Sequence, residues 1–103
     1  MFADENTVME LLINAGQARS DAIEAIAAAR RREWDVDDSL MQNAESACRE
    51  AHKIQTALIG LDEGSGKVQI NLFMVHAQDH LMTAMLCMDL AKEIIALRKE
   101  TAA

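Results

Sequence analysis

The segment "LFMVHAQDHLMTAMLCMDLAKEIIAL", residues 72–97, decides the fold of this 103-residue chain. Placed on a helix with 3.6 residues per turn, it divides into two apolar stripes and a narrow polar strip. The first stripe consists of Phe73, Ala77, Leu81, Ala84, Met88, Ala91 and Ile95. The second stripe consists of Leu72, Val75, Asp79, Met82, Leu86, Leu90 and Leu97. A helix with one buried stripe packs on its own chain, so a second stripe calls for another partner.

The rest of the chain predicts two more helices, over about 6–32 and 36–61, because apolar residues recur there at spacings of three and four. The third helix is expected over about 68–100, after a glycine-rich flexible connection over about 60–67. The chain has no proline and only 3% aromatic residues, which gives little support to a β-sheet. We therefore predict an all-α protein, an antiparallel three-helix bundle that forms a single domain over 1–103.

The formal net charge of -7 argues against a nucleic-acid binder that relies on phosphate contacts. The first residues lack the basic and apolar regions of a signal peptide, and no apolar run approaches membrane-spanning length. The two cysteines have no metal-motif spacing and no dense disulfide pattern. We expect a cytoplasmic protein with reduced, packed thiols.

The second stripe keeps near-heptad spacing from Leu72 to Leu86, which suits a helix that packs against copies of itself. Self-association is therefore expected. The alternative is a monomer in which the tilt of the first two helices covers this stripe. The width of the stripe alone does not choose between the two.

Asp79 interrupts the second stripe, where an unpaired carboxylate would be costly to bury. If the stripe forms a self-association axis, copies of Asp79 converge and need a cation or a proton. A hard divalent cation such as Mg²⁺ suits clustered carboxylates. The alternative is that Asp79 pairs with a neighbouring His or Lys.

His76 and His80 lie one turn apart in the polar strip of the same helix. A neutral imidazole has a free nitrogen that can act as a nucleophile, so His76 is a candidate for covalent group transfer. Gln78 and His80 could orient its ring or donate to an incoming anionic group. A zinc pair is the alternative, but the HExxH pattern needs glutamate where Ala77 stands.

Three motifs carry a family resemblance: "INAGQARS" at 13–20, "EAHKIQT" at 50–56 and "VHAQDHLMTAM" at 75–85. In this order and spacing they resemble the lactose/cellobiose/chitobiose-type enzyme IIA components of the bacterial sugar phosphotransferase system. The resemblance runs over nearly the whole chain. Alanine follows the first histidine, as in the diacetylchitobiose/cellobiose branch, which the chain resembles most. Other members of the family have glycine at this position.

The resemblance implies a homotrimer whose third helices form a central parallel coiled coil. It implies that His76 accepts a phosphoryl group from the histidine-containing phosphocarrier protein and passes it to a cysteine of enzyme IIB during disaccharide uptake. Asp79 would bind a divalent metal, Mg²⁺ by its chemistry, at the trimer axis. Gln78 and His80 would shape the site of the active histidine, and acidic groups would rim the cleft that docks the donor.

Two other functional classes compete with this hypothesis. One is a non-catalytic helical adaptor whose His/Asp cluster is a structural metal site, and the other is a zinc hydrolase. An adaptor would carry no acid-labile phosphate, whereas a hydrolase would hold zinc tightly and turn over a small substrate.

Overall fold

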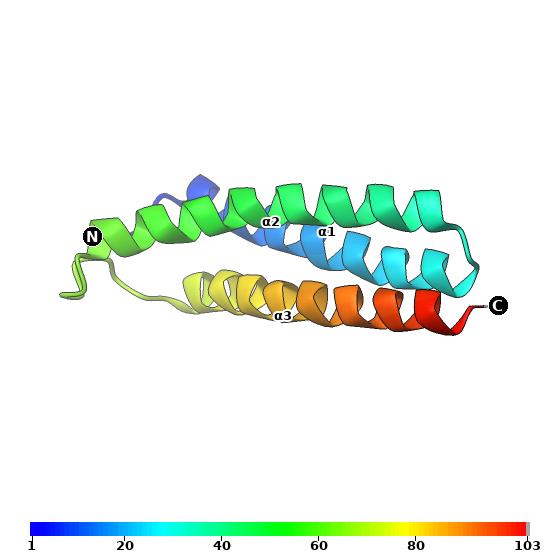
Figure 1. Cartoon of the computed structure of the whole chain (residues 1–103). Helices are drawn as coiled ribbons and strands as arrows, with labels where there is room; N and C mark the ends of the chain where they lie inside the picture. Colours follow the sequence, from blue (N-terminus) through cyan, green and yellow to red (C-terminus); the bar gives the residue numbers. More distant parts are fainter. Residues whose placement is uncertain (103) are drawn as a thin grey trace.

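The computed structural model describes residues 1–102, which form three long helices lying side by side (Figure 1). They are α1 (Glu5–Arg30), α2 (Trp34–Asp62) and α3 (Leu72–Thr101). The chain reverses direction at each connection, so α1 and α3 run parallel and α2 runs antiparallel to both (Figure 1). The bundle measures 56 × 21 × 19 Å, and the predicted all-α architecture of three helices is confirmed.

The connection between α1 and α2 has the expected length but lies two residues earlier in the chain than predicted. The helix α1 ends at Arg30 rather than at residue 32, because Arg32 has a positive φ of 61° that an α-helix does not accommodate. The helix α2 begins two residues early, at Trp34. The Arg98 side chain of α3 donates hydrogen bonds to the carbonyl oxygens of Ala29 (3.3 Å) and Arg30 (3.1 Å). These carbonyl groups at the C-terminal end of α1 have no partner within the helix.

The third helix begins at Leu72, so the predicted start at residue 68 is wrong. The Asn71 side chain accepts a hydrogen bond from the Met74 amide at 2.9 Å, which is the geometry of a helix N-cap. The preceding residues are not helical, because Gln69 forms a parallel β-bridge with Phe2. The predicted start of the connection at residue 60 is also wrong, because α2 continues to Asp62, next to Glu63 with φ of 55°.

The core of the bundle combines small residues on α1 with larger ones on α3. Buried α1 positions are mostly alanine, which lets the two neighbouring helices approach closely, and Leu11 is the one large side chain that is fully buried there. From α3, the first stripe packs inward as predicted: Phe73 is half-buried, and the other members are buried, namely Ala77, Leu81, Ala84, Met88, Ala91 and Ile95.

The second stripe of α3 remains on the surface of the protomer. Leu72 is 79% exposed and Leu86 is 59% exposed, and every other member is exposed as well: Val75, Asp79, Met82, Leu90 and Leu97. The alternative in which tilted first and second helices cover this stripe is therefore wrong. No part of residues 1–102 shields this apolar row from water.

One buried carboxyl group lies at the end of the bundle far from the α2–α3 connection. Asp37 of α2 is 1% exposed, and its Oδ2 atom has no hydrogen-bond partner in residues 1–102. Burial raises the pKa of this carboxyl above its ordinary value of 3.8, and the cation of Lys99 offsets this only in part. The carboxyl has a higher pKa in the folded chain than in the unfolded chain. The free energy of unfolding therefore falls as pH rises from the unfolded-state pKa through the folded-state pKa.

We expect the substitution Asp37→Asn to stabilise the protein at pH 7 by about 1 kcal/mol or more, because it removes the cost of a buried charge. The gain should shrink as pH falls and vanish below about pH 3.8, where both folded and unfolded wild-type chains are protonated. Denaturant unfolding at several pH values measures it. Asp38→Asn is the control, because Asp38 is exposed and 3.6 Å from Lys99; a gain for Asp37→Asn that does not change with pH would contradict the assignment.

Candidate functional site

His76 and His80 form a pair on successive turns of α3. Their ring centroids are 4.4 Å apart and the ring planes meet at 66°, so one ring presents its edge to the other. His76 is exposed, whereas His80 is half-buried. The arrangement leaves His76 open to a reaction partner while His80 restrains its orientation.

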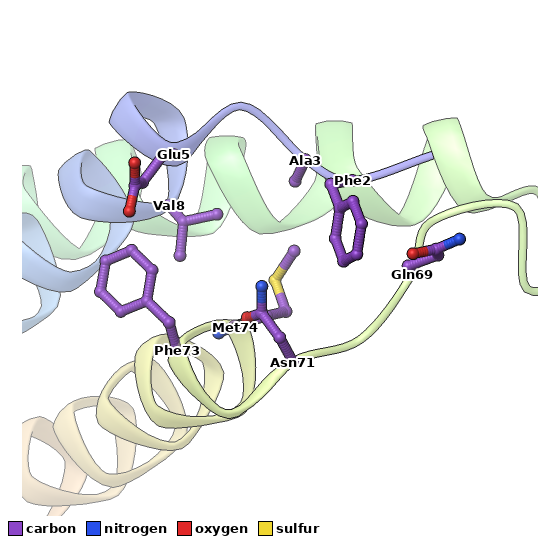
Figure 2. A pocket seen from close by; sticks show the side chains of 8 residues that line it. All are labelled: Phe2, Ala3, Glu5, Val8, Gln69, Asn71, Phe73 and Met74. Carbon is purple, nitrogen blue, oxygen red and sulfur yellow. Dashed lines mark hydrogen bonds between the residues drawn. The ribbon is translucent and has the colours of Figure 1, made fainter.

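The start of α3 is packed against α1, which fixes the segment that carries His76. Phe73, one turn before His76, lies beside Val8 and Glu5 of α1 in a pocket of about 300 Å³ (Figure 2). Phe2 and Met74 line the other side of this pocket. The two histidines follow Phe73 on the helix, so their strip borders the edge of α3 that faces α1.

Gln78 lies on the opposite edge of the second stripe. Its Oε1 accepts a hydrogen bond of 2.6 Å from Nε2 of Gln55, a residue of α2. Gln78 thus faces α2, whereas His76 borders the α1 side, and one copy of the chain does not bring the two together. The sequence did not predict this contact, although Gln55 is a polar residue on the inner side of the second helix.

Asp79 lies between these two edges, within the exposed second stripe. No Lys, Arg or His of the described residues is within ion-pair distance of its carboxylate, so the alternative of pairing with a neighbouring cation is wrong for the protomer. Asp79 borders a largely apolar groove of about 550 Å³ between the end of α2 and the start of α3. The groove also includes Ile59, Ile70, Val75 and Met82.

A single copy offers too few ligands for a divalent ion at Asp79. Within residues 1–102, no group of three His, Cys, Asp or Glu side chains comes close enough to hold a metal. One exposed carboxylate supplies one or two of the six or more oxygens that such an ion takes. Asp79 therefore fits a divalent metal only where several copies of the chain share it.

Both cysteines are free and half-buried. Burial raises the pKa of the Cys48 thiol, and the nearby charge of Asp89 adds to the effect. A thiol that stays protonated at neutral pH is a poor nucleophile, so the histidines are the better candidates for covalent chemistry.

None of the described helices is both long and apolar enough to cross a membrane.

The protomer is a three-helix bundle with an exposed histidine beside an exposed apolar stripe, and comparison with known proteins identifies the class to which it belongs. The profile of the family "PTS system, Lactose/Cellobiose specific IIA subunit" matches residues 6–99. The N,N'-diacetylchitobiose-specific EIIA component of Escherichia coli strain K12 is 45% identical over 96 residues, 93% of this chain and 83% of that protein.

Two solved structures have the same fold. The cellobiose-specific enzyme IIA of Bacillus anthracis superposes with a TM-score of 0.89 at 39% identity, covering 97% of this chain and 92% of that one. The IIA(chitobiose)–HPr complex of Escherichia coli gives a TM-score of 0.82 at 43% identity, covering 98% and 100% of the two chains. This chain belongs to the lactose/cellobiose-specific IIA family and is a phosphotransferase component of that system.

Proposed function

We propose that this protein is a phosphocarrier that takes up a phosphoryl group on His76. A nitrogen of the neutral imidazole attacks the phosphorus, and the bond from phosphorus to the donor's histidine nitrogen breaks. The exposure of His76 beside the restraining ring of His80 is the observation that carries this proposal. In the next step the imidazole is the leaving group and a cysteine of enzyme IIB receives the phosphoryl group.

The partners of these two steps follow from the family. A related IIA protein, 43% identical to this chain, was solved in complex with HPr, the histidine-containing phosphocarrier protein, which supports the same donor here. Relatives named for diacetylchitobiose, lichenan and lactose support a role in disaccharide uptake. The phosphoryl group moves between proteins that meet in the cytoplasm, where this chain is proposed to act.

The proposal includes a homotrimer built on the second stripe of α3. The stripe is an exposed apolar row, and burying each leucine side chain on association contributes about 1.5–3 kcal/mol. In a parallel trimer, the two edges of the stripe on neighbouring copies face each other. Gln78 of one copy would then lie on the side of the next copy's His76, which accounts for their separation within one protomer.

In the same trimer, the Asp79 carboxylates of the three copies would form a metal site. Three carboxylates at a common axis repel one another, and a divalent ion such as Mg²⁺ that they share removes the repulsion. The ion would supply charge neutralisation at the axis, and Asp79 of each copy would hold it. The adaptor hypothesis needs a structural His/Asp metal site and the hydrolase hypothesis needs a zinc site, and no group of three His, Cys, Asp or Glu side chains within residues 1–102 favours either.

One experiment tests the phosphocarrier proposal directly. The protein is incubated with phosphoenolpyruvate and the general phosphotransferase proteins, and the phosphorylated residue is mapped. The proposal expects a phosphate that is labile in acid and stable in base, located on His76. A protein that takes up no phosphate while the general proteins are active would overturn it.

We expect His80→Ala to slow phosphoryl transfer by about 10- to 100-fold without preventing it, because His80 orients the acceptor ring and can donate to a phosphoryl oxygen. Rapid-quench measurement of phosphoryl uptake tests this expectation. Thr83→Ala serves as the control, because it removes only the hydrogen bond of 3.1 Å to the His80 carbonyl. Transfer at the wild-type rate in His80→Ala would mean that His80 is only a packing residue.

A further inference from the structure

A groove between α2 and α3 gathers sulfur and nitrogen donors away from the His76 edge. It has a volume of about 540 Å³. Cys48 and His52 line it from α2, and Met85 and Met88 line it from α3. None of these four residues takes part in the phosphoryl transfer proposed above, so the groove is independent of that function.

The two helices hold these donors in a fixed relation. Cys48 and His52 are one turn apart and project to the same side of α2. Contacts between α2 and α3 hold the helices together on both sides of the groove. The Lys92 ammonium is 3.2 Å from the Glu45 carboxylate on one side, and the Gln55–Gln78 hydrogen bond lies on the other.

The donor set selects a class of metal ion. Within the described residues no three His, Cys, Asp or Glu side chains come together, so hard and borderline cations lack the ligands they require. The groove instead combines a thiol, an imidazole and thioethers, which are ligands of soft ions. Arg49, Lys53 and Lys92 also line it, and their positive charge opposes a divalent ion more than a monovalent one.

We propose that Cys48, His52 and Met85 bind one soft monovalent cation, Cu(I) or Ag(I), with Met88 beneath it. As the bond from Cys48 Sγ to the metal forms, the thiol proton leaves to solvent, so the site gains no net charge. The ion joins α2 to α3, the two helices that contact each other least in the bundle. A ligand that binds only the folded chain stabilises it, so the ion should raise the unfolding temperature.

Titration of the reduced, full-length protein with Ag(I), which needs no reductant to keep its valence, tests the site, and thermal unfolding provides the readout. We expect one tightly bound ion per chain and a higher Tm. Cys48→Ser should abolish both effects, while His52→Gln and Met85→Leu should each weaken binding by at least about tenfold. Competition with a Cu(I) chelator should rank the metal affinities of the variants in the same order.

The second free cysteine gives a matched control. Cys87 is also half-buried, but it lies on α3 outside this groove, so Cys87→Ser should keep both the affinity and the rise in Tm. Equal losses in Cys48→Ser and Cys87→Ser would overturn the proposal. Unchanged affinity in both His52→Gln and Met85→Leu would also overturn it, because binding would then be capture by a single thiol. Far-ultraviolet circular dichroism of each variant without metal shows that the bundle is intact.

Discussion

His76→Gln is expected to abolish phosphorylation, with labelling reduced by at least about a thousandfold, because the variant lacks the nitrogen that forms the bond to phosphorus. The fold should not change. His76 is exposed and its ring packs against the ring of His80, so the substitution should alter the free energy of unfolding by less than about 0.5 kcal/mol. Labelling with phosphoenolpyruvate and the general phosphotransferase proteins measures the first effect, and circular dichroism with sedimentation measures the second.

The other two histidines are the controls for this result. His80→Gln and His52→Gln each remove an imidazole and leave His76 in place, so both variants should still be labelled. His52 is exposed on α2 and lines the groove described above, which does not include His76. Undiminished labelling of His76→Gln would move the acceptor to one of these two residues and would refute the proposed role of His76.

The spacing of apolar residues was sufficient to predict which side of α3 packs inward. An apolar stripe at helical spacing has one low-energy placement, against the other helices, and the structure buries its members from Ala77 to Ile95. The same reasoning found a second stripe but did not decide whether the first two helices cover it, and the structure leaves it exposed. Periodicity is informative here because it reports burial, which dominates the energy of folding.

The beginning of α3 could not be predicted in the same way. Residues 68–71 continue an apolar pattern, but Gln69 is held by the Met1 carbonyl at 2.6 Å and Asn71 caps the helix. The first of these contacts joins segments far apart in the sequence, and no local signal reports it. The Asn71 cap was readable, because asparagine before an apolar run is a typical helix start.

The roles of the candidate site residues stay predictions, but their positions around α3 could be predicted. The sequence placed His76, Gln78, Asp79 and His80 on one helix, with both histidines in the polar strip and Asp79 in the second stripe. In the structure they divide among two edges and the stripe between them, because successive residues of a helix point 100° apart. In the proposed trimer a second copy would bring Gln78 toward His76, and the local sequence pattern of one chain does not report such an arrangement between copies.

Asp79→Leu is expected to leave a trimer that is more stable than the wild type by about 1–4 kcal/mol, because a packed hydrophobe replaces three converging charges. Its neighbours in the stripe are apolar, so a leucine continues the row. The variant should also lack the response of stability to Mg²⁺ and to chelator that we expect of the wild type. Phosphoryl transfer should largely survive, since Asp79 lies in the stripe that the proposed trimer would bury rather than on the edge that carries His76. Unfolding with and without Mg²⁺, together with sedimentation, measures these effects.

Asp79→Asn separates charge from packing in this test. It removes the repulsion but leaves a polar group at the axis, so it should lose the Mg²⁺ response and gain less stability than Asp79→Leu. Asp89→Leu is a control on the same helix, because Asp89 is exposed outside the second stripe and should keep the Mg²⁺ response. If Asp79→Leu sediments as a monomer while the wild type is a trimer, the axial position is refuted. The carboxylate would then have to hold the copies together through an ion pair between chains, since no Lys, Arg or His among residues 1–102 of its own chain forms an ion pair with it.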